Sequence, residues 1–457
     1  MDEDLSLHRL TEDWGTRESV ELYLDRCQVD TPGKIVSSVW EHIHERRATV
    51  GKVVDFGAGD GRFAREGRYK SYVGYEIDAA RCERASLPSS ATLLPQCAFS
   101  ARIDDADVCL GNPPYVRNQD LPAGWRQTAA ASVQARTGVK LSGLANAWQY
   151  FFLLGLASTK PDGLVAIVIP YEWVSRPSAE ALRNFIRENG WDVTVYRLMD
   201  DTFNRVLTTS SITIVDKRAS TGKWVFHEED LDGSFRVLPT EAGGICGVLK
   251  YATRRDARAC EVHAKRGLSP GTQKVLTLTE GERVRSGLMI GTDVVHCVTS
   301  LRGLDPAYTV LNDKIFNKHF RLAGAKCWLI RTDRKPSARL KAYLDSTPPE
   351  NYQTSTCSNR DRWWEFTMPE MPALLVATGF RGVFPKVIVN SIGARAVGSV
   401  SGIYGVSQKN RAKIANALRE IDLTDCIVPH SNGLKKLEIN QLNTLLQSIA
   451  GEKATSK

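Results

Sequence analysis

The stretch Lys52-Val53-Val54-Asp55-Phe56-Gly57-Ala58-Gly59-Asp60-Gly61 decides how the first half of this chain folds. Its apolar residues Val53, Val54 and Phe56 predict a short buried strand. The glycines that follow let the backbone turn sharply and let a ligand approach its N–H groups closely. A helix is expected to begin near Phe63. A strand, a glycine loop and a helix in this order predict a cofactor site at the end of the strand.

The spacing of the glycines and a later acidic residue narrow the choice of cofactor. A dinucleotide site favours the pattern G-x-G-x-x-G, whereas this loop reads G-x-G-x-G. That pattern suits S-adenosylmethionine better, because this cofactor has no pyrophosphate. The next predicted strand, 72–78, contains Glu76, which lies 21 residues after Asp55. A carboxylate at that strand end can accept hydrogen bonds from both ribose hydroxyls, although an ordinary capping acid is the alternative.

A second stretch, Val108-Cys109-Leu110-Gly111-Asn112-Pro113-Pro114-Tyr115, ends an apolar run at two prolines. The prolines forbid a helix there and have no backbone N–H to donate. Asn112 therefore stands at the mouth of a predicted strand. Its side-chain oxygen and the Pro113 carbonyl are two neighbouring acceptors, which match the two N–H donors of an aromatic amine. Tyr115 offers a flat ring on which a base can stack. A proline turn that merely ends a core strand is the alternative.

Strands and helices alternate between residues 50 and 216, which predicts a doubly wound, parallel-type α/β sheet. The stretch 116–140 is predicted to be a long polar loop beside the site. The stretch 217–265 is polar and irregular and is interpreted as a domain junction. Residues 1–28 are predicted to be helical. The further predicted strands are 164–170, 193–198 and 211–216, and the further predicted helices are 144–158 and 179–188.

Asn112-Pro113-Pro114-Tyr115 resembles the catalytic motif of S-adenosylmethionine-dependent amino-methyltransferases. That motif serves adenine-N6 methylation of DNA and glutamine methylation of release factors. Asparagine at its first position favours adenine, because cytosine-N4 enzymes usually carry serine there. Thr31-Pro32 opens a predicted helix ahead of the glycine loop and resembles the cofactor-contacting motif X. Thr31 is expected to cap that helix. This motif order resembles the gamma-group (TaqI-like) DNA adenine-N6 methyltransferases of restriction-modification systems.

The resemblance implies a Rossmann-like methyltransferase sheet, S-adenosylmethionine as cofactor and a defined set of site residues. The implied catalytic residues are Asn112, Pro113, Pro114 and Tyr115. The implied stacking partners of the target base are Tyr115 and Phe203, and an ordinary core role is the alternative for Phe203. The implied cofactor contacts are Thr31, Asp55, Gly57, Gly59, Glu76 and Phe99. The acidic residue expected just before Phe99 is missing, since Gln96 or Cys97 stands there. The chemistry needs no metal.

Charge is distributed unevenly along the 457 residues. Residues 1–240 carry 28 Lys and Arg against 33 Asp and Glu, whereas residues 241–457 carry 32 against 19. The second part is therefore strongly basic, which favours contact with a polyanion. We predict a catalytic domain over 1–240 and a mixed α+β target-recognition domain over 241–457, in which 284–293 resembles the glycine-rich signature of TaqI-like enzymes. The candidate DNA contacts are Arg117, Arg331, Arg334, Lys335 and Arg362.

The sequence thus predicts a DNA adenine-N6 methyltransferase that flips its target base out of double-stranded DNA. Because no nuclease constellation is found, a cognate restriction endonuclease is expected to be a separate chain. The lack of a signal pattern or a long apolar run predicts a cytoplasmic protein without a membrane segment. An RNA adenine-N6 or protein glutamine methyltransferase is the alternative. A DNA-binding module with a decayed methyltransferase fold is a third hypothesis.

Overall fold

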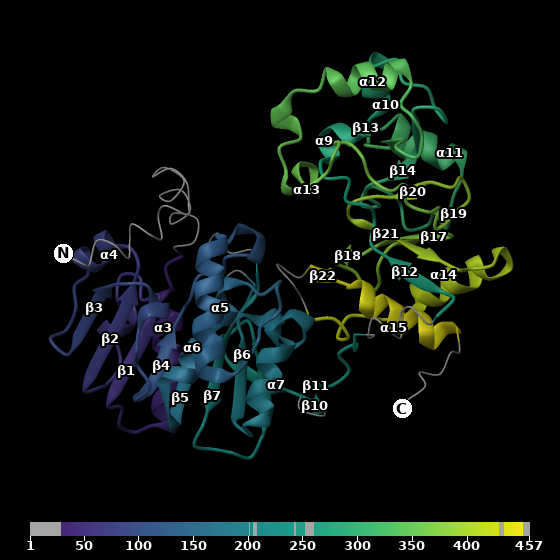
Figure 1. Cartoon of the computed structure of the whole chain (residues 1–457). Helices are drawn as coiled ribbons and strands as arrows, with labels where there is room; N and C mark the ends of the chain where they lie inside the picture. The colour runs from purple at the N-terminus through teal and green to yellow at the C-terminus, as the bar shows by residue number, and fades with distance from the viewer. Residues whose placement is uncertain are drawn as a thin grey trace. The chain divides into compact units, whose positions relative to one another are not determined.

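The computed structural model describes residues 29–200, 202–203, 208–241, 244–251, 260–428 and 434–450. The chain divides into two compact units (Figure 1). Unit 1 comprises residues 1–247 with 429–433, and unit 2 comprises residues 248–428 with 434–457. The helix predicted over 1–28 lies outside the described residues. Among the helices that are described, none is long and apolar enough to cross a membrane.

Unit 1 is built on a sheet that has nine strands within the described residues, in the order β3-β2-β1-β4-β5-β7-β6-β8-β9. The strands from β3 to β5 are parallel, and β7 is antiparallel to both of its neighbours, β5 and β6. This confirms the predicted doubly wound α/β sheet, with two reversed strands, β7 and β9. The bounds are β1 Lys52–Phe56, β2 Ser71–Glu76, β3 Ala91–Pro95, β4 Ala106–Gly111, β5 Thr159–Pro170, β6 Asp192–Arg197, β7 Ser210–Asp216, β8 Trp224–Glu229 and β9 Phe235–Leu238.

Helices cover both faces of this sheet because successive strand residues point to opposite sides. Helix α3 buries its apolar stripe in the core cluster that contains Val108 and Leu110 of β4. Helix α6 packs on the other face, where a Cβ added to Gly155 would lie 2.9 Å from Sγ of Cys109. The glycine therefore lets the apolar helix approach β4 closely. The helices of unit 1 are α3 Gly33–Arg46, α4 Ala79–Arg84, α5 Ala123–Thr137, α6 Ala147–Ser158 and α7 Glu180–Glu188.

Three local predictions are wrong. The predicted loop 116–140 contains helix α5, an alanine-rich segment that begins after Pro122 and ends at Gly138, whose φ is +73°. The predicted junction contains strands β8 and β9, because Trp224 and Phe226 alternate with more exposed residues and are buried in the core. The helix expected near Phe63 is a single 3-10 turn over Arg62–Arg65.

Unit 2 is a mixed α and β structure with its own apolar cores (Figure 1). Its larger sheets have the orders β12-β21-β17-β19-β15 and β13-β16-β14-β20 within the described residues. The strands of these sheets are β12 His263–Lys265, β13 Thr277–Leu278, β14 Val294–Val298, β15 Val310–Leu311, β16 Trp328–Ile330, β17 Leu374–Ala377, β19 Val387–Asn390, β20 Arg395–Ala396 and β21 Val400–Tyr404. The helices are α9 Gln273–Leu276, α10 Glu280–Arg285, α11 Asp313–Phe316, α12 Ala338–Asp345, α13 Ser355–Ser358, α14 Arg411–Glu420 and α15 Ile439–Ala450. A short ribbon of unit 2 pairs β18 Gly379–Phe380 with β22 Lys435–Lys436. A similar ribbon in unit 1 pairs β10 Thr240–Glu241 with β11 Gly244–Ile245.

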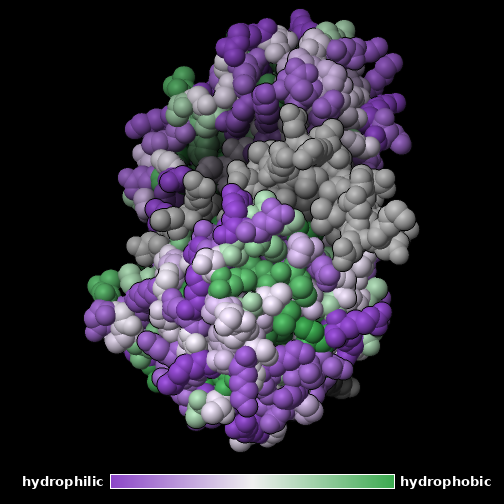
Figure 2. Space-filling view, turned by 90° about the vertical axis from the view of Figure 1, so that its left-hand side faces the viewer, coloured by the Kyte–Doolittle hydropathy of each residue, from purple (hydrophilic) through white to green (hydrophobic). Residues whose placement is uncertain are grey.

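Figure 2 looks at the side of unit 1 on which β3 and α4 lie in Figure 1. Hydrophilic residues cover most of this face, and an apolar area lies among them in the lower part of the view. Exposed apolar areas with a polar rim often accompany ligand-binding surfaces.

Candidate active site

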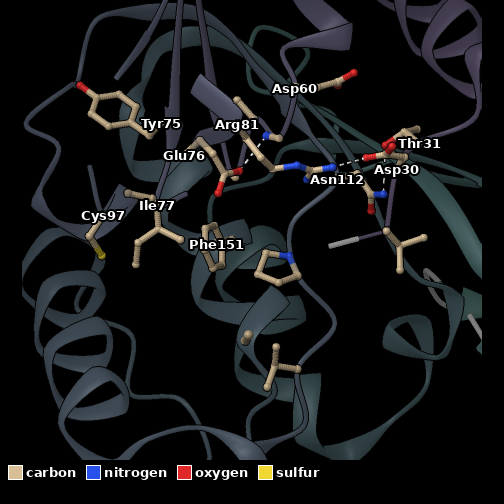
Figure 3. Close-up of a pocket in the computed structure, with 18 of the residues that line it drawn as sticks. Asp30, Thr31, Asp60, Tyr75, Glu76, Ile77, Arg81, Cys97, Asn112 and Phe151 are labelled. Carbon is tan, nitrogen blue, oxygen red and sulfur yellow. Dashed lines mark hydrogen bonds and ion pairs between the residues drawn. The ribbon is translucent and has the colours of Figure 1, made fainter. Parts of the chain in front are cut away.

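A cavity opens where strands β1, β2 and β4 end (Figure 3). In open α/β sheets, ligands bind at this carboxyl edge of the strands. The cavity has a volume of about 1020 Å³, including its open mouth. It brings together residues that are far apart in the sequence, among them Thr31, Gly57, Gly59, Glu76, Ile77, Gln96, Cys97, Asn112, Pro114 and Phe151.

Glu76 is fixed at the glycine loop by two backbone donors. The N–H of Gly59 donates to its Oε2 at 2.8 Å, and the N–H of Asp78 donates to its Oε1 at 3.0 Å. The residue is only 7% exposed, and this burial raises the pKa of the carboxyl group, although the two N–H donors partly offset the rise. Each oxygen keeps a free lone-pair direction, so the carboxylate can accept further hydrogen bonds from a ligand in the cavity.

Asp55 lies one layer behind the cavity, although we predicted that it contacts the cofactor. It is fully buried, and the hydroxyl of Tyr72 donates to its Oδ2 at 2.5 Å. Its Oδ1 has no hydrogen-bond partner among the described residues. A Cβ added to Gly111, whose φ is +144°, would lie 2.4 Å from this Oδ1. Asp55 therefore fills the space under the bend that leads from β4 into Asn112.

The environment of Asp55 predicts a pH-dependent stability. Burial raises its pKa to about 7, despite the hydrogen bond from Tyr72. Between the unfolded pKa near 4 and the folded pKa near 7, the folded protein binds more protons, so stability falls as pH rises. We expect Asp55→Asn to remove this slope and to be the more stable protein at pH 8, by a few kcal/mol at most. Urea unfolding of both proteins at pH 5 and pH 8 measures the effect, and parallel pH profiles would contradict it.

Asn112 lines the cavity. Its Nδ2 donates to Oγ1 of Thr31 at 3.1 Å, while its Oδ1 is buried and has no partner among the described residues. Thr31 is 4% exposed and does not cap helix α3, which begins at Gly33. The predicted capping role is therefore wrong, because the hydroxyl of Thr31 is engaged by the amide of Asn112. Thr31 instead holds that amide with its acceptor free.

The two aromatic residues predicted to stack on a target base lie outside the cavity lining. The hydroxyl of Tyr115 is buried, and burial raises the pKa of this phenol, an effect that the nearby Ser210 partly offsets. Phe203 is 6% exposed and packs in the core cluster with Tyr196 and Leu198. Base stacking by these rings stays a prediction, and for Phe203 it requires the ring to leave this packing.

Aromatic residues form the apolar end of the cavity, and Phe99 is the one that the sequence predicted as a cofactor contact. Phe151 of α6 lines the cavity together with Trp125 of α5. Phe99 lies behind them, and its ring meets the ring of Phe151 edge-on, with centroids 5.0 Å apart. Gln96 and Cys97, which replace the expected acid, both line the cavity. This end can therefore enclose a flat aromatic group such as adenine.

A chain of charged side chains forms the opposite rim. Its ion pairs were not predicted from the sequence. Asp30 accepts from Nη2 of Arg81 at 2.5 Å and pairs with Nη2 of Arg62 at 2.9 Å. Arg62 also pairs with Asp60 at 2.9 Å, and Arg65 pairs with Asp60 at 2.7 Å. Burial alone would raise the pKa of Asp60, but the two arginines lower it to about 2.

The candidate DNA contacts differ in how free their side chains are. Arg331 pairs with Asp333 at 2.5 Å and donates to the carbonyl of Gly291 at 2.7 Å, so it also braces its own loop. Arg117 pairs with Asp120 at 2.8 Å but keeps 68% of its side chain exposed. The guanidinium of Arg362 lies 5.8 Å from the ring centroid of Trp364. Arg334 and Lys335 are exposed. Phosphate contact by these residues stays a prediction.

The fold of unit 1 and the lining of its cavity fit a domain that binds S-adenosylmethionine. The fixed carboxylate of Glu76 and the aromatic wall around Phe151 fit the ribose and the adenine of this cofactor. Residues 93–201 match the family described as Eco57I restriction-modification methylase.

Two curated relatives are similar over part of the chain. The Type II methyltransferase M.XamI of Xanthomonas campestris pv. amaranthicola is 29% identical over 206 residues, which are 40% of this chain and 38% of that protein. The Type II methyltransferase M.BanIII of Aneurinibacillus aneurinilyticus is 28% identical over 102 residues, which are 22% of this chain and 16% of that protein. The chain thus matches well under half the length of either relative.

Solved structures of restriction-modification proteins are also similar. The type IIG restriction endonuclease BpuSI has a TM-score of 0.42 at 12% identity, covering 91% of this chain and 58% of that chain. A type I restriction-modification methyltransferase subunit from Streptococcus thermophilus has a TM-score of 0.38 at 21% identity, covering 47% of this chain and 51% of that chain.

Proposed function

We propose that this chain is a site-specific DNA methyltransferase that transfers a methyl group from S-adenosylmethionine to N6 of adenine in double-stranded DNA. It would serve as the modification part of a restriction-modification or defence system. The observation that carries the proposal is the side chain of Asn112. Its amide nitrogen is held by Thr31, and its buried oxygen has no partner among the described residues. A buried acceptor without a donor is costly unless a ligand supplies one.

The proposed chemistry is orientation and electrostatic stabilisation rather than covalent catalysis. The amine of adenine is a poor nucleophile because its lone pair is delocalised into the ring. Oδ1 of Asn112 and the carbonyl of Pro113 accept hydrogen bonds from its two N–H groups and favour a tetrahedral nitrogen. The lone pair then points away from the two acceptors. When bound, the cofactor supplies a sulfonium methyl group for this lone pair to attack, so that the carbon–sulfur bond breaks, S-adenosylhomocysteine leaves and the methylated nitrogen loses one proton to solvent.

Adenine inside a duplex cannot reach Asn112, so the proposal includes base flipping. The ring of Tyr115 follows the two prolines directly and would take one face of the flipped base, with Phe203 as the candidate for the other. Unit 2, with its excess of basic residues, would hold the DNA and read its sequence as the target-recognition domain. A cognate restriction endonuclease would be a separate chain that recognises the same DNA sequence.

The acceptor class can be tested directly with purified protein. We expect tritium from labelled S-adenosylmethionine to enter high-complexity duplex DNA, and not total RNA or a protein extract. Sequencing that reads modified bases is expected to place N6-methyladenine in one short sequence context. Transfer to RNA or to protein glutamine would support the alternative enzymes and overturn the proposal. Cofactor binding without transfer to any acceptor would favour a DNA-binding module with a decayed methyltransferase fold.

A further inference from the structure

The charged side chains at the rim of the cavity have no role in the chemistry proposed at Asn112. Asp30, Arg62 and Arg81 all line the cavity. The carboxylate of Asp30 lies between two guanidinium groups, with Arg81 on its Oδ1 at 2.5 Å and Arg62 on its Oδ2 at 2.9 Å. The side chain of Asp30 is 53% exposed, so these oxygens remain open to a ligand. Paired opposite charges at a cavity wall suit a ligand group that itself carries both signs.

We propose that Asp30, Arg62 and Arg81 form the subsite for the amino-acid end of the cofactor. That end carries a carboxylate and an ammonium group on one carbon atom. In this assignment the guanidinium groups receive the carboxylate, and Asp30 receives the ammonium group. The ligand thus exchanges the ion pairs within the protein for ion pairs across the site. The charges stay matched throughout, so no uncompensated charge is left in the cavity.

The position of Arg81 supports this assignment. A Cβ added to Gly59 would lie 3.3 Å from its Nη1, so the guanidinium lies over that glycine. The N–H of the same glycine donates to Glu76, the candidate acceptor for the ribose hydroxyls. Figure 3 shows Arg81 pointing toward Asp30, with Glu76 drawn close to the base of the arginine and Asn112 close to Asp30. The amino-acid end and the ribose belong to one short cofactor, so their subsites must adjoin, as these residues do.

The assignment has a structural alternative. Arg62 and Arg81 could merely tie the segment before helix α3 to the glycine loop, since Arg62 also donates to the carbonyl of Thr31. A structural tie would affect every ligand of the cavity equally. A subsite for the amino-acid end would affect only ligands that carry that end. The inference rests on the cofactor and not on the methyl acceptor, so its failure would leave the proposed DNA substrate untouched.

Calorimetric binding to the full chain separates the two interpretations. The probes are S-adenosylhomocysteine, which carries the amino-acid end, and 5′-methylthioadenosine, which lacks it. We expect Arg81→Met to weaken S-adenosylhomocysteine about 10- to 100-fold, as the loss of a charge-assisted hydrogen bond does. Binding of 5′-methylthioadenosine is expected to change less than about threefold. Equal weakening of both probes, or no weakening of either, would overturn the assignment.

Two further variants keep this test independent of folding. Arg65→Met is the matched control, because Arg65 pairs with Asp60 at the far end of the same chain of charges but does not line the cavity. It is expected to leave both affinities unchanged, and selective weakening in this variant would count against the assignment. If Arg81→Met does not fold, Arg81→Lys retains the charge and loses the second donor. A smaller loss confined to S-adenosylhomocysteine then supports the subsite, and an unselective loss overturns it.

Discussion

Asn112→Ala is expected to lower the rate of methyl transfer by about 100-fold or more. Removal of one preorganised polar contact to the reacting group typically costs about 3 kcal/mol in the barrier. The affinity for S-adenosylmethionine is expected to change little, because Glu76 and the aromatic wall remain. Single-turnover transfer of tritium to duplex DNA measures the first quantity, and calorimetry measures the second. A variant that transfers methyl at the normal rate would remove Asn112 from the mechanism.

The same argument predicts a graded response at Thr31. Thr31→Val removes the oxygen that accepts from Nδ2 of Asn112 at 3.1 Å and keeps the shape of the side chain. The amide can then rotate and exchange its oxygen for its nitrogen, so transfer is expected to slow about 10-fold, which is the effect of one hydrogen bond. Thr31→Ser should restore it. Asn118→Ala is the matched control. Asn118 lies shortly after Asn112 in the sequence but does not line the cavity.

The fold could be predicted from the sequence where a local pattern and a tertiary role agree. The run Lys52–Phe56 with its glycines, and the run that ends at Asn112, both show their burial and their turns directly in the residue types. Helix α5 could not be predicted because its apolar residues do not form a clear stripe at helical spacing. The residues on either side of it in the sequence are polar. It is fixed instead by contacts far along the chain, such as the hydrogen bond from Arg136 to the carbonyl of Ala157.

The site shows the same limit at the level of single side chains. Motif residues such as Glu76 and Asn112 could be placed at the cavity, because a strand end fixes where they lie. The sequence could not predict which motif residues line the cavity and which lie behind its wall. Asp55 lies beneath the bend at Gly111, and Phe99 lies behind Phe151. The pairing of Asp30 with Arg81 joins two segments that are 51 residues apart. Only the closed fold brings such charges together.

Glu76→Ala is expected to weaken S-adenosylmethionine by about 100-fold or more. The carboxylate is the candidate acceptor for two ribose hydroxyls, and each hydrogen bond to a charged group is worth about 1.5–3 kcal/mol. The substitution also releases the N–H of Gly59, so the loop loses one anchor. Glu76→Gln separates these effects, because it keeps an acceptor for Gly59 and loses the charge. Glu83→Gln, which alters an exposed acid on helix α4, is the matched control.

The pH dependence of cofactor binding distinguishes a ribose acceptor from a purely structural acid. Burial raises the pKa of Glu76, so its charge is lost at a higher pH than for an ordinary glutamate. Affinity for 5′-methylthioadenosine should therefore fall as pH falls through this raised pKa, and Glu76→Gln should lack that decline. A 2′-deoxy derivative of the same ligand should lose affinity in the native protein and lose less in the variant. If both proteins show the same pH profile and the same preference for the 2′-hydroxyl, the ribose contact belongs to another residue, and the role of Glu76 is confined to anchoring the glycine loop.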